Sequence, residues 1–201
     1  MNRTDSIIKL NKVLQWDVVI IGGGASGLGI ALDASKRGYK TLLLEKYDFG
    51  KGTSSRSTKL IHGGVRYLQN GGITLVIESL KERGILKRNA PHLVQDLSFV
   101  IPTYDWWASP FYGIGMKIYD MMAGKLGLGK SEIISKQETE KLIPNVNKKG
   151  LRGGVIYHDG QFDDSRMAIT LALSADSKKT ALLNYCNVEG LIKKDGEIKG
   201  L

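Results

Sequence analysis

The N-terminal part of the chain alternates short, largely apolar runs with a segment of helical periodicity. Val18–Ile21 and Thr41–Leu44 are two such runs, each typical of a strand that is buried on both faces of a parallel sheet. Between them, apolar residues recur at helical spacing over residues 28–34, and Gly38 ends the segment. This order predicts a β-α-β unit and therefore an α/β fold.

Turn-forming and apolar residues predict the elements that follow. Residues 48–65 are rich in Gly, Ser, Thr and Lys and are expected to form a loop. Ser135 and Glu138 match a capping box, which predicts a short helix that ends at Pro144. The remaining predictions are a helix at 73–89, a strand at 97–101 closed by Pro102, a partly helical stretch at 104–126, strands at 153–157 and 181–188, a helix capped by Asp163 or Asp164, and hairpin arms at 190–193 and 197–201.

A glycine motif follows the first predicted strand. Gly22, Gly24 and Gly27 fit the pattern G-x-G-x-x-G, which allows a tight turn, a close approach of a pyrophosphate to the backbone, and close packing of helix on strand. Glu45 ends the second strand 23 positions after Gly22, close to the spacing of about 20 expected for an acid that binds ribose hydroxyls. A carboxylate there would repel a 2′-phosphate, so the motif predicts a dinucleotide other than NADP. NAD and FAD both stay open at this point.

A second unusual segment begins one loop later. Residues 53–68 read TSSRSTKLIHGGVRYL, with five hydroxyl side chains followed by Lys59, His62 and two glycines. Hydroxyl and backbone N–H groups can hold phosphate and polyol oxygens, and Arg66 can bind a phosphate or carboxylate through two parallel hydrogen bonds. Composition alone is equally compatible with a flexible surface loop.

Length, charge and cysteine content narrow the function classes. The chain has 201 residues, a formal net charge of +9 and one cysteine, Cys186, so an intrachain disulfide is excluded and a reducing compartment is favoured. The positive charge favours anionic partners such as phosphorylated substrates or phospholipid surfaces. The sequence contains no nucleic-acid motif, no apolar run of about 20 residues and no secretory signal, and we predict no metal site.

The two segments together resemble FAD-dependent glycerol-3-phosphate dehydrogenases and the related glycerol-3-phosphate oxidases. The run TSSRSTKLIHGGVRYL after IIGGGASGLGIALDASKRG and LLLEK carries the resemblance, and TSSRSTKLIHGGVRYL is the more specific part. The resemblance continues through ERGILKRNAPHL at 82–93, KIYDMMAGKLG at 117–127 and YHDGQFDDSRMAI at 157–169. It implies an α/β, Rossmann-like FAD-binding domain of the amino-acid-oxidase or hydroxylase type, interleaved with part of a substrate domain.

The resemblance also implies roles for individual residues. The ADP half of FAD would be held by Gly22, Gly24, Gly27 and Glu45. The pyrophosphate, ribityl chain and isoalloxazine would be contacted by Ser54, Ser55, Ser57, Lys59, Leu60, His62, Gly63 and Gly64, with Val188 touching adenine through its backbone. The residues expected at the substrate are His62, Arg66 and Tyr67.

The order of elements predicts a chain that contains only part of such a fold. We expect an N-terminal extension at 1–15, the first part of the FAD-binding domain at 16–95, a partial substrate or cap region at 96–160, and a return to the FAD-binding domain with the start of a β-meander at 161–201. The predicted parallel sheet has few strands, and the predicted β-meander stops at its second strand. This pattern favours a truncated fold over a complete one.

The activity implied by the resemblance is oxidation of sn-glycerol 3-phosphate to dihydroxyacetone phosphate. Hydride would pass from C2 to flavin N5, and the electrons would pass on to quinone or oxygen. His62 is a candidate base for the 2-hydroxyl proton, with cofactor binding as the other reading of this residue. Open alternatives are another FAD-dependent oxidoreductase acting on a 2-hydroxy acid or amino acid, and a non-catalytic FAD-binding fragment.

The aromatic and Met-rich stretch at 104–126 has two interpretations. It could be a substrate-domain helix packed in a core, or a docking surface for a membrane that contains quinone. The single cysteine favours a cytoplasmic protein. If residues 104–126 form a docking surface, we expect the protein to lie at the inner face of the plasma membrane. The sequence does not decide the oligomeric state.

Overall fold

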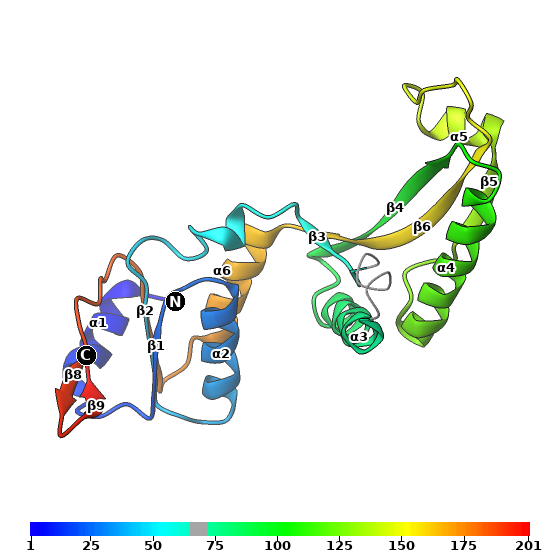
Figure 1. Cartoon of the computed structure of the whole chain (residues 1–201). Helices are drawn as coiled ribbons and strands as arrows, with labels where there is room; N and C mark the ends of the chain where they lie inside the picture. The colour runs from blue at the N-terminus through cyan, green and yellow to red at the C-terminus, as the bar shows by residue number, and fades with distance from the viewer. Residues whose placement is uncertain (65–71) are drawn as a thin grey trace. The chain divides into compact units, whose positions relative to one another are not determined.

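The computed structural model describes residues 1–64 and 72–201, which form two compact units (Figure 1). Unit 1 contains Met1–Thr58 and Asp163–Leu201, and unit 2 contains Lys59–Phe162. The described helices are α1 (Arg3–Lys12), α2 (Ala25–Lys36), η1 (Thr53–Ser55), α3 (Ile73–Asn89), α4 (Ala108–Ala123), η3 (Gly124–Leu126), α5 (Lys136–Leu142) and α6 (Asp164–Ala175). The described strands are β1 (Val18–Ile21), β2 (Thr41–Leu44), β3 (Leu60–Ile61), β4 (Val94–Thr103), β5 (Glu132–Ser135), β6 (Gly153–Phe162), β7 (Thr180–Leu183), β8 (Ile192–Lys194) and β9 (Glu197–Gly200).

Unit 1 is built on a parallel sheet with the strand order β1-β2-β7. Side chains alternate across its strands, so Ile20, Leu43 and Leu182 share one face and pack against α2 and α6. Those two helices lie side by side on this face (Figure 1). The predicted β-α-β unit is therefore confirmed, with β7 added as a third parallel strand.

The opposite face of the same sheet is covered only in part. Leu42, Leu44, Ala181 and Leu183 form a buried cluster there, against which Leu10 of α1 and Trp16 pack. On the edge strand β1, however, Val19 is 42% exposed and Ile21 is 57% exposed. The prediction that Val18–Ile21 is buried on both faces is therefore wrong for one face, which the described residues cover only in part.

Unit 2 is built on an antiparallel sheet in which β6 is the central strand. β4 pairs with β6 along its whole length, from Val94 opposite Phe162 to Thr103 opposite Gly153. β3 and β5 pair with β6 along its other edge, at opposite ends of the strand. The helices α3 and α4 contact each other through a buried cluster of Val76, Leu80, Tyr119 and Ala123.

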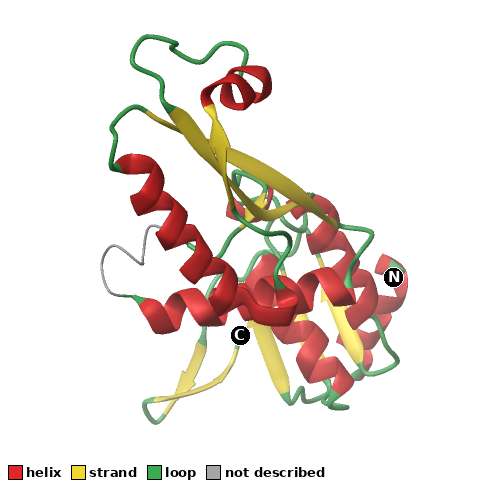
Figure 2. Cartoon of the chain, turned by 90° about the vertical axis from the view of Figure 1, so that its right-hand side faces the viewer, coloured by secondary structure: helices red, strands yellow, loops and turns green. Residues whose placement is uncertain are grey.

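Most predicted elements of unit 2 are confirmed, and two strands are longer than expected. The helix at 73–89 has the predicted bounds, and Ser135 and Glu138 form the predicted capping box of α5. Figure 2 draws the helices of the chain in red and the strands in yellow. β4 continues through Pro102, where the sequence predicted its end. β4 is an edge strand, and the missing N–H of a proline is tolerated at an edge. The two short strands β3 and β5 were not predicted.

The C-terminal part of unit 1 differs from the prediction in one respect. The strand expected at 181–188 ends at Leu183, because Tyr185 adopts a positive φ of 50° and its N–H donates to the carbonyl of Tyr47. The predicted hairpin is present as β8 and β9, joined by a turn with positive φ at Asp195 and Gly196. Within the described ranges, every helix is too short or too polar to cross a membrane.

Candidate cofactor-binding site

The glycine motif forms the turn between β1 and α2. Gly22 has a φ of +109°, and its N–H donates to the carbonyl of Leu44 at 2.8 Å, which joins the turn to β2. A Cβ at Gly27 would lie 2.0 Å from the carbonyl oxygen of Gly22, closer than any two such atoms can approach. The first and third glycines of the motif are therefore required by the backbone of this turn.

The second glycine of the motif opens α2. Gly24 is the N-cap residue and provides no side-chain acceptor to the first turn, which also lacks acidic residues. Ser54 of η1 takes part of that role, since its Oγ accepts a hydrogen bond from the N–H of Ala25 at 2.8 Å. A Cβ at Gly24 would lie 3.1 Å from that Oγ. The remaining N–H donors and the positive end of the helix dipole suit a phosphate anion.

Glu45 lies at the same turn. One carboxylate oxygen accepts a hydrogen bond from the N–H of Gly23 at 2.6 Å, and the other accepts from the N–H of Tyr47 at 2.7 Å. Two carboxylate oxygens have about four acceptor positions, so both can accept further bonds from a ligand hydroxyl. The structure thus brings Glu45 to the glycine turn, where a ribose could meet it.

The segment after Glu45 folds back onto unit 1. The N–H of Gly50 donates to the carbonyl of Gly23 at 2.8 Å, and Phe49 enters the core between the sheet and its helices. Further along, the hydroxyl of Ser57 donates to the buried carboxylate of Asp164 at 2.7 Å. Ser55 donates weakly to the carbonyl of Gly52 at 3.4 Å. Residues 45–58 are therefore anchored to unit 1 at several points, and the predicted loop contains one short helix, η1.

The second half of the hydroxyl-rich segment belongs to unit 2. Lys59 has a positive φ of 60°, and its carbonyl accepts from the N–H of Phe162 at 3.0 Å. Leu60 pairs with β6 opposite Gln161. His62 is exposed, whereas Gly63 and Gly64 are buried. The segment thus presents one imidazole to solvent next to two buried glycines.

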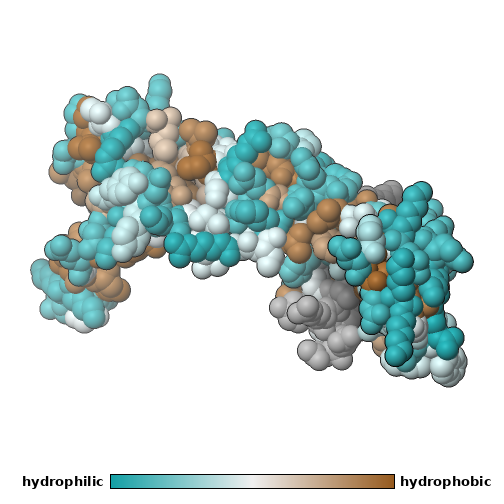
Figure 3. Space-filling view, turned by 90° about the horizontal axis from the view of Figure 1, so that it is seen from above, coloured by the Kyte–Doolittle hydropathy of each residue, from teal (hydrophilic) through white to brown (hydrophobic). Residues whose placement is uncertain are grey.

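Three predicted site residues remain, two expected at the substrate and one expected at the adenine. Arg66 and Tyr67 lie outside the described residues. Val188 is partly buried and packs on the sheet face that contains Leu42 and Leu44. It lines a largely apolar hollow of about 880 Å³ together with Ile21. On the face shown in Figure 3, brown apolar areas interrupt the hydrophilic surface.

A buried polar network in unit 2 was missed by the sequence analysis. The side chains of Arg83, Tyr119 and Asp159 are almost fully buried and contact one another. The hydroxyl of Tyr119 also accepts a hydrogen bond from the N–H of Gly63 at 2.9 Å. Burial and the neighbouring Asp159 carboxylate raise the pKa of Tyr119, so its hydroxyl stays protonated. The three residues come from α3, α4 and β6, and no local spacing relates them.

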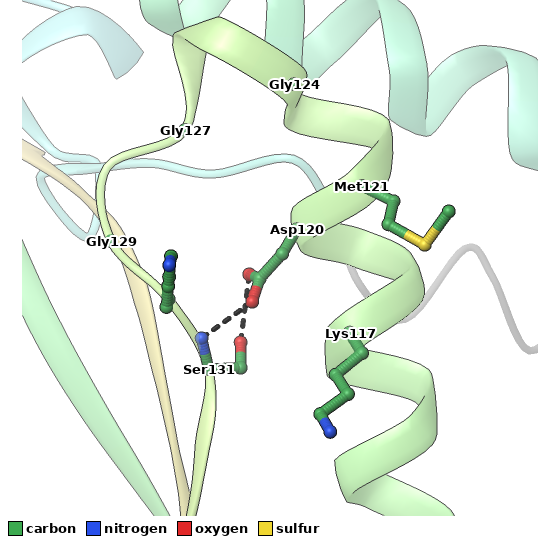
Figure 4. Close-up of a pocket in the computed structure, with 8 residues that line it drawn as sticks. Lys117, Asp120, Met121, Gly124, Gly127, Gly129 and Ser131 are labelled. Atoms are coloured by element: carbon green, nitrogen blue, oxygen red, sulfur yellow. Dashed lines mark hydrogen bonds between the residues drawn. The ribbon is translucent and has the colours of Figure 1, made fainter.

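A separate hollow of about 560 Å³ lies beside the C-terminal half of α4 (Figure 4). Asp120 links its two walls, because its carboxylate accepts from the N–H of Ser131 at 2.6 Å and from the hydroxyl of Ser131 at 2.9 Å. Lys117 comes from the same helix, and Met121 points away from Ser131 in this view. None of the sequence-predicted site residues lines this hollow, so it is not part of the candidate site.

The parallel sheet, the glycine turn and the open N-terminus of α2 define a dinucleotide-binding α/β protein. The residues fit such a ligand, since Gly24 leaves the N-terminus of α2 without a capping side chain of its own and Glu45 lies at the same turn. Residues 17–201 match the family described as "FAD dependent oxidoreductase", and the chain belongs to this family. The predicted fold class and FAD as cofactor are thereby confirmed.

The relatives found by sequence and by structure agree with that assignment. The chain is 44% identical over 208 aligned positions to "Glycerol-3-phosphate dehydrogenase, mitochondrial" of Schizosaccharomyces pombe, covering 100% of this chain and 32% of that protein. The FAD complex of glycerol-3-phosphate dehydrogenase from Bacillus halodurans superimposes with a TM-score of 0.71 at 32% identity, covering 98% of this chain and 32% of that one. The FAD-bound L-alpha-glycerophosphate oxidase from Mycoplasma pneumoniae has a TM-score of 0.66 at 22% identity, over 90% of this chain and 47% of that one, which shows the shared fold alone.

These matches confirm the resemblance that the sequence motifs indicated. The chain spans about a third of the length of the Schizosaccharomyces pombe and Bacillus halodurans relatives. It aligns with a portion of these relatives, which are named glycerol-3-phosphate dehydrogenases.

Proposed function

We propose that the protein containing this chain oxidises sn-glycerol 3-phosphate to dihydroxyacetone phosphate with FAD as cofactor. The observation that carries the proposal is the combination of an intact glycine turn with 44% identity, along the whole chain, to a protein named glycerol-3-phosphate dehydrogenase. The net charge of +9 is compatible with a phosphorylated substrate.

We assign the ADP half of the cofactor to residues of unit 1. The free N–H groups at the start of α2, next to Gly24, would bind the pyrophosphate. The carboxylate of Glu45 would accept hydrogen bonds from the ribose, and Ser54 and Ser57 would line the path of the phosphates. Ser55 and the backbone at Val188 complete this assignment.

We assign the flavin and substrate contacts to the segment that opens unit 2. When bound, FAD supplies the acceptor for the hydride that leaves C2 of the substrate. Lys59, Leu60, Gly63 and Gly64 would hold the cofactor, and the exposed imidazole of His62 would accept the proton of the 2-hydroxyl or, alternatively, bind the cofactor.

Arg66 and Tyr67 follow this segment in the sequence. A guanidinium binds a phosphate through two parallel charge-assisted hydrogen bonds, so Arg66 would anchor the substrate phosphate, with Tyr67 beside it. The division of this chain into FAD-binding parts at 16–95 and 161–201, the latter with the start of a β-meander, and a partial substrate region at 96–160 stays a prediction.

We further propose quinone as the electron acceptor, with oxygen as the alternative. The support is a row of exposed apolar side chains on α4, among them Phe111, Ile114, Ile118 and Met121, which is 81% exposed, preceded by Trp106, which is 77% exposed. Aromatic and aliphatic side chains of this kind are favoured at a membrane surface. Co-sedimentation with liposomes that is lost in Trp106→Ser and Trp107→Ser would support docking, and unchanged co-sedimentation would refute it.

The compartment stays a prediction as well. A single cysteine favours a reducing location such as the cytoplasm, while the names of relatives such as the Schizosaccharomyces pombe protein place those proteins in the mitochondrion.

The experiment that tests the proposed function is anaerobic reduction of the purified protein. A flavin absorbance spectrum that bleaches with sn-glycerol 3-phosphate, and not with glycerol or a 2-hydroxy acid, is the expected result. Bleaching by an amino acid or a 2-hydroxy acid instead would support another oxidoreductase of the family. Bound FAD that no substrate reduces would indicate a non-catalytic cofactor-binding protein.

A further inference from the structure

Three buried polar side chains converge beneath the segment that contains His62. Arg83 of α3 forms an ion pair with Asp159 of β6, and Arg83 also donates to the carbonyl of His158 at 3.3 Å. Tyr119 of α4 donates its hydroxyl proton to Asp159, with oxygen–oxygen distances of 3.0 and 3.1 Å. The exposed fractions are 1% for Arg83, 1% for Tyr119 and 3% for Asp159.

Such a network is costly to place in a core. Removing two charges from water is compensated only when geometry and hydrogen bonding are good, and a buried ion pair is often no more stabilising than apolar residues of the same volume. Apolar side chains could make such contacts, as Val76 and Leu80 do between α3 and α4. The network therefore calls for a role that apolar residues could not fill.

The network provides a hydrogen-bond acceptor for the backbone N–H of Gly63. Its N–H is buried and donates to the hydroxyl of Tyr119 at 2.9 Å. A Cβ at Gly63 would lie 2.5 Å from both this hydroxyl and Cδ2 of Leu80, so the chain passes in contact with α3 and α4 at this point. A phenylalanine at position 119 would leave this buried N–H without an acceptor, at the full cost of desolvating it.

The hydrogen-bond directions explain why all three side chains are needed. The hydroxyl of Tyr119 can accept a hydrogen bond from the N–H of Gly63 only while its own O–H points elsewhere, and Asp159 accepts the hydrogen bond from that O–H. Arg83 in turn compensates the buried charge of Asp159. Each member thus fixes the orientation of the next, ending at the backbone of Gly63.

We propose that Tyr119, oriented by Asp159 and Arg83, is a positioning residue that fixes the backbone of Gly63 and thereby the direction of the adjacent His62 side chain. The consequence for proton transfer rests on the proposed function, in which His62 acts on the substrate or cofactor. The positioning itself depends only on the buried contacts in unit 2.

Hydrogen–deuterium exchange tests the positioning without any ligand. In Tyr119→Phe, exchange of the Gly63 amide is expected to accelerate by about tenfold, with the amides of the β4–β6 ladder unchanged. The matched control is Tyr104→Phe, which removes from the same unit a hydroxyl that donates to the carbonyl of Asn147. Unchanged exchange at Gly63 in Tyr119→Phe would overturn the proposal.

A second variant covers the case in which Tyr119→Phe does not fold. Asp159→Asn keeps an acceptor oxygen for the hydroxyl of Tyr119 but removes the charge that Arg83 pairs with. Exchange at Gly63 between that of wild type and that of a fully exposed amide is expected. Exchange identical to wild type would count against the network as the cause.

Measurements of flavin reduction in the FAD-loaded protein distinguish this proposal from the proposed function. Tyr119→Phe is expected to slow flavin reduction at saturating sn-glycerol 3-phosphate by about tenfold with little change in KM, because a displaced base affects the chemical step more than binding. Faster Gly63 exchange with an unchanged reduction rate would overturn the link to His62. If wild type binds no FAD, the proposed function fails, and the exchange experiment still decides the positioning.

Discussion

Gly27 lies so close to Gly22 that no side chain can be placed between them. A Cβ on Gly27 would lie 2.0 Å from the carbonyl oxygen of Gly22 and 3.1 Å from its carbonyl carbon. Both contacts are to backbone, which cannot rotate away as a side chain can. The first turn of α2 therefore sits directly on the end of β1, and this contact keeps the helix N-terminus at the glycine turn.

The substitution Gly27→Ala is expected to disrupt this turn. The clash with Gly22 forces α2 away from β1, and overpacking of this kind costs about 1–3 kcal/mol or more. The free energy of unfolding, measured in urea, should fall by at least that amount. Loss of FAD binding should accompany it.

Gly29 provides a matched control two residues further along the same helix. A Cβ there meets nothing within 4 Å. Replacing a helical glycine by alanine in open space is expected to stabilise the protein by about 0.5–1 kcal/mol. Equal effects of Gly27→Ala and Gly29→Ala would contradict the close contact of strand and helix.

Removal of the Glu45 carboxylate should weaken cofactor binding. Glu45→Ala leaves the N–H groups of Gly23 and Tyr47 without their acceptors and removes the proposed ribose acceptor. The dissociation constant for FAD, measured by flavin fluorescence with the apoprotein, should rise by about tenfold or more. Asp33→Ala removes an exposed carboxylate of α2 that pairs with exposed Arg37, and it should leave FAD affinity unchanged.

Local sequence patterns were sufficient to predict the helices, strands and turns that are determined by residues close to one another in the sequence. The β-branched run before Gly22 and the capping box at Ser135 each encode their element within a few positions, and both are confirmed. The dinucleotide turn was predictable for the same reason, since glycine spacing, helix and acid follow one another in the chain.

Long-range contacts account for what the sequence did not predict. β3 contains two residues and exists only because it pairs with Gln161 and Gly160, a hundred positions away. β4 continues past Pro102 because it pairs with β6 as far as Thr103, which lies opposite Gly153. Arg83, Tyr119 and Asp159 meet only after three elements pack together, and a lone Arg in an amphipathic helix carries no sign that it will be buried.

His62 offers a direct test of the proton-transfer assignment. Its imidazole is exposed beside two buried glycines, so it is available to a substrate. If it acts as the base, His62→Ala should reduce the rate of flavin reduction by about a hundredfold or more. Stopped-flow absorbance with sn-glycerol 3-phosphate measures this rate.

His92 is the natural comparison for His62. It is exposed as well, follows α3 after Pro91, and belongs to the same unit. His92→Ala should leave flavin reduction unchanged. An intact reduction rate in His62→Ala would eliminate the catalytic role and leave cofactor binding as the function of this side chain.

The buried hydroxyl of Tyr119 predicts a specific loss of stability at high pH. Burial, reinforced by the Asp159 carboxylate, raises the pKa of Tyr119 above its ordinary value, so the folded protein keeps the phenol neutral where the unfolded chain ionises it. The stability linked to this group is therefore complete below about pH 10, the pKa of an unfolded tyrosine, and is lost as the pH rises above that value. The free energy of unfolding should fall by ~1 kcal/mol per pH unit in that range through this residue alone.

Comparison with Tyr119→Phe isolates this contribution, because all other titrating groups are common to both proteins. Urea unfolding at about pH 9, 10 and 11 should give a wild-type curve that falls more steeply than that of Tyr119→Phe. Tyr104→Phe removes a more exposed hydroxyl and should follow the wild-type slope. Parallel curves for wild type and Tyr119→Phe would contradict a raised pKa of Tyr119 in the folded protein.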